Sequence, residues 1–180
     1  MKNAGEIEII FERGLRDRLK VILAIDNGGW SMDPYIDIVQ VLFDHSRSQF
    51  KDLKIYFFHN TIYDYIWGDP ARRLKPQSVD ELVRMDPETR FIIVGDASMA
   101  PYELMATDGS IHIEERSGKP SIERLRFLAG IFKYSAWLNP KPSKEWPYTS
   151  TINYIRRIFP MFEISLDGLE KMVAYLMSKN

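Results

Sequence analysis

Apolar residues along the chain follow two patterns, one typical of strands and one typical of helices. Short apolar runs, the clearest of them nearly unbroken, predict strands, several of which are buried on both faces. They occupy residues 21–25, 53–59, 90–94, 135–138 and 161–164. Apolar residues with helical spacing predict the intervening helices. These segments are residues 35–50, 121–133, 149–159 and 166–177.

This alternation predicts an α/β fold with a doubly wound, mostly parallel, Rossmann-like sheet that has helices on both faces. Residues 62–67 alternate polar and apolar positions directly after a strand, so we expect them to return as one antiparallel edge strand. Residues 6–11 predict a short edge strand within an N-terminal extension at residues 1–19. Residues 20–180 are then the main domain.

Proline and cap signals divide the remainder of the chain. Residues 68–77 contain two prolines and predict a loop, after which Ser78 is expected to cap a short helix that ends near Met85. Residues 139–148 contain three prolines and predict a rigid loop without a helix. Residues 107–120 are expected to be an irregular excursion or a small hairpin.

Composition narrows the function classes. Lysine plus arginine number 24 against 25 acidic residues, so no overall field attracts nucleic acid or an anionic membrane. The chain has no cysteine, which excludes disulfides, thiolate zinc sites and cysteine nucleophiles. No apolar run has the length of a membrane span, and the first residues lack the apolar core of a signal peptide. We therefore expect a cytoplasmic protein.

Candidate chemistry gathers where the predicted strands end. The stretch KVILAIDNGGWSMDPY at residues 20–35 is a strand that stops at Asp26, followed by a glycine turn, Ser31 and a helix start. Thr61 and Asp96 follow two other strands. The carboxyl ends of parallel strands meet at one edge, where two carboxylates and two hydroxyls would suit Mg²⁺ or Mn²⁺. Aspartates at strand ends also cap helices, and this alternative stays open.

The same residues carry a resemblance to a known family. The order of the strand with DNGGWSMDP, then FHNT, then VGDASM resembles von Willebrand factor A domains, especially bacterial ones similar to the CoxE family. The match runs from residue 20 through nearly the whole chain. It implies a metal-ion-dependent adhesion site, in which Mg²⁺ or Mn²⁺ is held by Asp26, Ser31, Thr61 and Asp96.

Two departures from the family motif alter this site. The family has an Asp-x-Ser-x-Ser loop, whereas Gly28 replaces the first serine and Trp30 stands where the second is expected. Ser31 is displaced by one residue. Binding by the two aspartates is therefore a firmer expectation than binding by Ser31, and loss of the site is the alternative.

The resemblance implies a non-enzymatic protein-interaction domain, whose metal completes its coordination with an acidic side chain of a partner. It also implies an AAA-type ATPase as a partner. A rival interpretation is a Mg²⁺-dependent phosphoryl-transfer or hydrolytic enzyme that uses Asp26 and Asp96. The chain has no phosphate-binding Gly-Lys-Ser/Thr loop, and Gly28 stands where a haloacid-dehalogenase-like motif needs an aspartate. A metal-free scaffold is the third interpretation.

A partner would contact the loops around this edge, for which we single out Trp30, Gly28, Gly29 and Ser98. Trp30 is either an exposed anchor for a partner or a cover for its own loop. Ser98 either contacts a partner or caps the turn after Asp96. His59, near Thr61, could polarise a water, but a packing role agrees better with the lack of a nucleophile motif.

Overall fold

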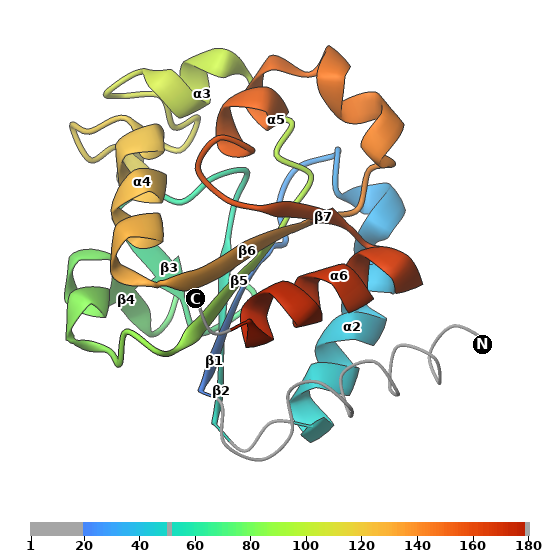
Figure 1. Cartoon of the computed structure of the whole chain (residues 1–180). Helices are drawn as coiled ribbons and strands as arrows, with labels where there is room; N and C mark the ends of the chain where they lie inside the picture. The colour runs from blue at the N-terminus through green and yellow to red at the C-terminus, as the bar shows by residue number, and fades with distance from the viewer. Residues whose placement is uncertain (1–19, 50–51, 179–180) are drawn as a thin grey trace.

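The computed structural model describes residues 20–49 and 52–178, so the predicted extension at residues 1–19, with its edge strand, lies outside it. The described residues form a seven-stranded sheet in the order β4-β3-β2-β1-β5-β6-β7 (Figure 1). Strands β2, β1, β5, β6 and β7 are parallel to one another. At one edge β3 pairs antiparallel with β2, and β4 pairs antiparallel with β3. The strands are β1 (Val21–Asp26), β2 (Leu53–Phe58), β3 (Tyr65–Trp67), β4 (Pro76–Ser78), β5 (Arg90–Val94), β6 (Tyr134–Asn139) and β7 (Met161–Glu163).

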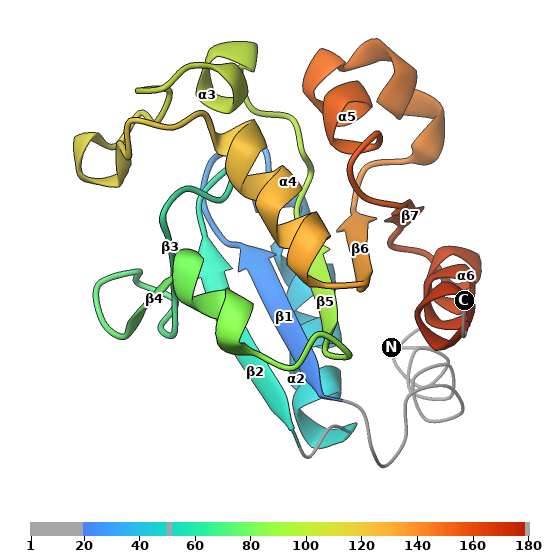
Figure 2. The same ribbon diagram turned by 60° about the vertical axis from the view of Figure 1, so that its left-hand side comes forward.

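Helices cover both faces of this sheet (Figure 2). One face packs against α2 (Ile36–Gln49) and α6 (Leu166–Met177). The other face packs against α3 (Pro101–Met105), α4 (Ser121–Ile131), α5 (Ser150–Ile155) and the 3₁₀ helix η2 (Asp80–Arg84). Three more short 3₁₀ helices lie in the connections: η1 (Asp33–Tyr35), η3 (Ile113–Glu115) and η4 (Ser143–Tyr148).

Strand β1 is the centre of the core because all six of its residues are buried. Successive side chains of a strand point to opposite faces. Leu23 accordingly joins the cluster with Leu42 of α2 and Met172 of α6, whereas Ala24 joins the cluster with Leu125 of α4. Burial on both faces explains why the sequence of β1 is an unbroken apolar run.

The predicted doubly wound, mostly parallel sheet with helices on both faces is confirmed. Its antiparallel edge contains two strands, because Pro76–Ser78 forms β4 and pairs with β3. Ser78 is therefore a strand residue, and its predicted role as a helix cap is wrong: Val79 precedes η2 and makes no side-chain cap. Three residues with little strand propensity become a strand only because β3 offers an edge.

The loop predicted at residues 139–148 contains the helix η4, so the expectation of no helix there is wrong. Pro142 lies before the first turn, where a missing N–H removes no hydrogen bond, whereas Pro147 lies inside the short helix and removes one. The buried side chain of Trp146 anchors this turn to the core. In the described residues, no helix combines the length and the apolar character needed to cross a membrane.

Candidate functional site

Asp26 and Asp96 lie at the ends of two neighbouring parallel strands. Asp26 is the last residue of β1, and Asp96 comes two residues after β5, with Ile25 and Val94 in register. The chain winds from β1 towards β2 on one side and towards β5 on the other, so these strands flank the point at which the strand order reverses. In open α/β sheets ligands bind in the crevice at this point.

Gly95 allows the two strand ends to approach each other. A Cβ atom on Gly95 would lie 3.1 Å from Cβ of Asp26 and 3.5 Å from its Oδ2. A side chain there would press against the Asp26 carboxylate. The absence of a side chain at this position therefore leaves room for the Asp26 carboxylate beside the end of β5.

Each carboxylate uses one oxygen in the structure and leaves the other without a hydrogen bond. Oδ1 of Asp26 accepts hydrogen bonds of 3.1 Å from the backbone N–H groups of Gly28 and Asn60, and Oδ1 of Asp96 accepts one of 3.0 Å from that of Ser98. Both Oδ2 atoms are buried and have no hydrogen-bond partner among the described residues. Buried polar atoms without partners are rare because each costs roughly 1–3 kcal/mol.

Two residues with left-handed backbone conformation form the turns around these carboxylates. Asn60 has φ 58° and donates its N–H to Asp26, while Ala97 has φ 55° and lies between Asp96 and Ser98. Alanine rarely adopts this conformation. The hydroxyl of Thr151 in α5 holds it by donating to the carbonyl of Ala97 at 2.8 Å. Strained backbone that the surrounding structure holds in this way is common at functional sites.

Burial raises the pKa of Asp26 from 3.8 to about 7. The negative charge of Asp96 adds to this effect, whereas the N–H groups of Gly28 and Asn60 oppose it. The positive charge of Arg72 also opposes it, but burial prevails, so this carboxyl group binds a proton near neutral pH. A bound divalent cation would supply the positive charge that stabilises the ionised form of Asp26.

Lys141 is the one cation among the described residues that forms an ion pair with either carboxylate. Its Nζ lies 3.7 Å from Oδ2 of Asp96 and donates a hydrogen bond of 2.8 Å to Oγ of Ser98. Lys141 lies in the loop after β6, the strand next to β5. Lys141 was not among the site residues expected from the sequence. The signal that could have indicated it was its position just beyond a buried strand.

Neither of the two predicted hydroxyls hydrogen-bonds to a carboxylate of the site. The hydroxyl of Thr61 is buried and lies 2.5 Å from that of Ser121, which itself donates to the carbonyl of Ile62 at 2.8 Å. Thr61 therefore donates its proton to Ser121 at the start of α4. Ser31 is exposed, and its hydroxyl makes no hydrogen bond with Asp26 or Asp96.

Gly28 and Gly29 lie against the loop that follows β2. A Cβ on Gly28 would overlap Cδ2 of the His59 ring, and one on Gly29, which has φ +84°, would lie 2.8 Å from Oδ1 of Asn60. The loop after Asp26 can thus pack here only with glycines. The serine that the family has at the first of these positions would not fit.

His59 has a packing role beside the candidate site. Its ring is buried and makes a T-shaped contact with that of His112, with centroids 4.7 Å apart. Burial lowers the pKa of His59 from 6.5 to about 4, and the charges of Arg72 and His112 act in the same direction. The imidazole is therefore neutral at neutral pH. No local pattern predicts the contact with His112, which lies in an irregular loop.

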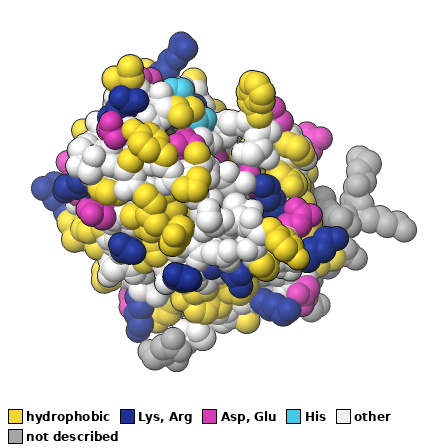
Figure 3. Space-filling view, turned by 90° about the horizontal axis from the view of Figure 1, so that it is seen from above, with side chains coloured by type: hydrophobic (Ala, Val, Ile, Leu, Met, Phe, Trp, Pro, Cys, Tyr) yellow, Lys and Arg dark blue, Asp and Glu magenta, His cyan; other side chains and the backbone are white. Residues whose placement is uncertain are grey.

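Exposed apolar side chains surround the strand ends. Trp30 is 93% exposed and does not cover its own loop, and Tyr148 at the end of η4 is 89% exposed. Ser98 is half-buried and accepts the hydrogen bond from Lys141. Figure 3 views the molecule from the side towards which the parallel strands point and shows apolar groups among charged ones. A partner could therefore make both apolar and charged contacts with this face.

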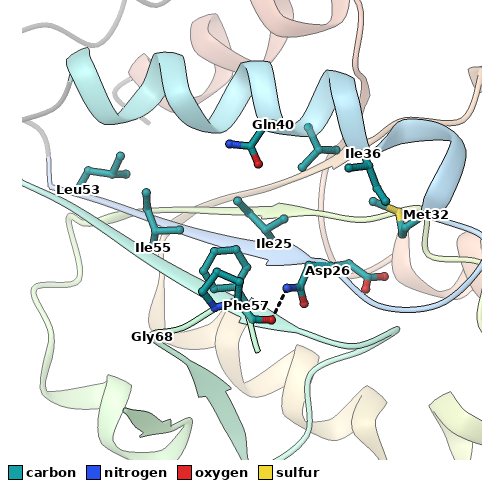
Figure 4. Close-up of a pocket in the computed structure, with 12 residues that line it drawn as sticks. Ile25, Asp26, Met32, Ile36, Gln40, Leu53, Ile55, Phe57 and Gly68 are labelled. Carbon is teal, nitrogen blue, oxygen red and sulfur yellow. Dashed lines mark hydrogen bonds between the residues drawn. The ribbon is translucent and has the colours of Figure 1, made fainter. Parts of the chain in front are cut away.

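A pocket of about 670 Å³ opens beside Asp26 between α2 and β2. Figure 4 shows Ile36 of α2 and Ile55 of β2 among its apolar walls. Asn27 and Pro70 also line the pocket, and Nδ2 of Asn27 donates to the carbonyl of Pro70 at 2.6 Å. The candidate site is thus bordered by an apolar hollow on the α2 side of the sheet.

The donors at the strand ends are carboxylate oxygens, a type of ligand that hard divalent cations prefer. Within residues 20–49 and 52–178, no three histidine or acidic side chains are grouped as metal ligands. A cation here would be held by two carboxylates and completed by neutral oxygen atoms, as is usual for Mg²⁺. The two buried Oδ2 atoms, which accept no hydrogen bond, are the carboxylate oxygens that would bind such an ion.

Comparison of the chain with family models, with curated proteins and with solved structures finds no match. The von Willebrand factor A interpretation therefore depends on the motif residues and their order alone, and it stays a prediction.

Proposed function

We propose that this chain is a non-enzymatic protein-interaction domain of the von Willebrand factor A type, with a divalent cation at the ends of β1 and β5. The observation that carries the proposal is the pair of buried Oδ2 atoms of Asp26 and Asp96, which lack hydrogen-bond partners. A divalent cation would compensate both carboxylates at once. It would also replace the proton that burial favours on Asp26.

Asp26 and Asp96 would hold the ion, which is Mg²⁺ or Mn²⁺. The family resemblance adds Thr61 and Ser31 as hydroxyl ligands, and water completes the coordination. One of these waters would give way to an acidic side chain of a partner. Trp30, Gly28, Gly29 and Ser98 would contact that partner, and the resemblance points to an AAA-type ATPase as a partner.

Calorimetric titration of Mg²⁺ and Mn²⁺ into chelator-treated protein tests the metal site. We expect saturable binding by the wild type and none by Asp26→Asn or Asp96→Asn, because each change removes a charged ligand. Asp33→Asn is the matched control, since Asp33 is an exposed carboxylate in the same loop. Binding by either site variant that is as tight as that of the wild type, or absence of binding in both the wild type and Lys141→Met, would overturn the proposal.

A separate assay tests the non-enzymatic part of the proposal. Generic phosphate esters incubated with the Mg²⁺-loaded protein should show no turnover. A metal-dependent rate that disappears in Asp26→Asn would instead favour the hydrolytic enzyme. Circular dichroism of each variant would establish that its fold is retained.

A further inference from the structure

The backbone around Lys141 holds its side chain against Asp96. The N–H of Lys141 donates to Oδ1 of Asn139 at 2.9 Å, and Nδ2 of the same asparagine donates to the backbone carbonyl of Asp96 at 2.9 Å. Nε1 of Trp146 donates to the carbonyl of Lys141, again at 2.9 Å. Asn139 thus joins the loop of Lys141 to the turn of Asp96, and the buried Trp146 fixes its other side.

The ammonium group of Lys141 lies beside an oxygen atom that a divalent cation would also bind. Nζ of Lys141 is 3.7 Å from Oδ2 of Asp96, the same oxygen that is free for a metal ion. The side chain of Lys141 is 22% exposed, whereas that of Asp96 is 2% exposed. Lysine has a long flexible stem and a strongly hydrated charge, so its head can leave a partly exposed position for solvent.

We propose that Lys141 is an internal competitor of the divalent cation at this site. When the metal is absent, its ammonium group neutralises Asp96, and when the metal binds, this group moves away from Oδ2 towards solvent. The inference rests on the proposed function, because it presumes that Asp26 and Asp96 bind the metal. Its physical basis is repulsion between two cations that share one carboxylate oxygen in a largely buried position.

Two lysine variants test this competition by calorimetric titration of Mg²⁺. Lys141→Met removes the charge and keeps much of the stem, and Lys144→Met is the matched control, since Lys144 is an exposed lysine in the same loop. We expect Lys141→Met to bind Mg²⁺ at least about tenfold more tightly than the wild type, since a neighbouring charge shifts an ionisation equilibrium by a similar factor. Lys144→Met should bind as the wild type does.

The outcomes separate this inference from the proposed function. Equal or weaker binding by Lys141→Met, with saturable binding by the wild type, overturns the competition alone. Binding by Lys141→Met but not by the wild type supports it in its strongest form. Absence of binding in all three proteins overturns the proposed function and the competition with it.

Amine labelling of the wild type gives a second measurement that requires no variant. We expect saturating Mg²⁺ to raise the labelling rate of Lys141, measured by mass spectrometry, severalfold relative to that of Lys144 in the same molecule. A rate ratio that does not change while Mg²⁺ binds would show that the ammonium group stays in place, and would overturn the inference.

Discussion

The imidazole ring of His59 fills the space beside Gly28 where a side chain would otherwise lie. A Cβ on Gly28 would overlap the ring and would lie 3.0 Å from Nη1 of Arg72. The departure from the family motif at residue 28 is therefore matched by a side chain from the loop after β2. The loops after β1 and β2 therefore pack against each other, and a substitution in one should alter the packing of the other.

This packing predicts that a serine at residue 28 is costly. We expect Gly28→Ser to lower the free energy of unfolding by about 1–3 kcal/mol, the usual cost of overpacking. In the His59→Ala background the same change should cost at least about 1 kcal/mol less, because the ring no longer occupies the space. Urea unfolding of the four proteins measures this coupling, and strictly additive costs would contradict it.

The pKa values of Asp26 and His59 predict opposing effects of pH on stability without metal. The pKa of Asp26 is raised from 3.8 to about 7, so the folded state binds the extra proton and this group's contribution falls as pH rises from 4 to 7. The pKa of His59 is lowered from 6.5 to about 4, so the unfolded state binds the extra proton. Its contribution rises between pH 4 and 6.5.

Single substitutions should separate these two contributions. In chelator, Asp26→Asn should leave a free energy of unfolding that rises from pH 4 to 6.5, whereas His59→Gln should leave one that falls from pH 4 to 7. Urea unfolding over this pH range measures both slopes. If the two variants keep the wild-type profile, neither group has the shifted pKa that its burial implies.

The hydrogen bond between the hydroxyls of Thr61 and Ser121 predicts that substitutions at the two residues have non-additive effects on stability. Thr61→Val removes the donor to Ser121, and we expect the free energy of unfolding to fall by about 1 kcal/mol. Thr61→Ser keeps the hydroxyl and is the control. Ser121→Ala should cost at least as much, because the carbonyl of Ile62 also loses its donor. The double variant should cost less than the sum of both.

The exposure of Trp30 predicts that its side chain contributes little to the fold. We expect Trp30→Ala to change the free energy of unfolding by less than about 0.5 kcal/mol, as for other surface substitutions. Acrylamide quenching should lose its most accessible component in this variant, because Trp67 is half-buried and Trp137 and Trp146 are 0% and 5% exposed. A large fall in the unfolding midpoint would show instead that Trp30 packs against its loop.

The sheet and the two aspartates could be predicted because their signals are local. β1 and β5 are buried on both faces and therefore appear as unbroken apolar runs that end where Asp26 and Asp96 begin their turns. Parallel strands place such ends at the same edge. The expectation that the two carboxylates meet needed only the assumption that β1 and β5 are neighbours, which the structure confirms.

The remainder of the site depends on contacts between distant segments. The hydroxyl of Thr61 is engaged by Ser121, which lies 60 residues further along the chain. Lys141 reaches Asp96 only because β6 pairs with β5, and no local pattern specifies that order. Likewise, His59 occupies the space beside Gly28 because β2 pairs with β1. Such contacts follow from tertiary packing, and the local patterns of a single sequence do not predict them.

The edges of the described sheet also affect how copies of this protein behave towards one another. An open sheet edge is a template for aggregation, and short strands and prolines are common protections against it. Here the outermost strands, β4 and β7, have three residues each, and β4 begins with Pro76, which has no N–H to offer. The apolar strands β1 and β5 stay in the interior of the sheet. The arrangement that buries the candidate site also keeps the strands most prone to self-association away from neighbouring molecules.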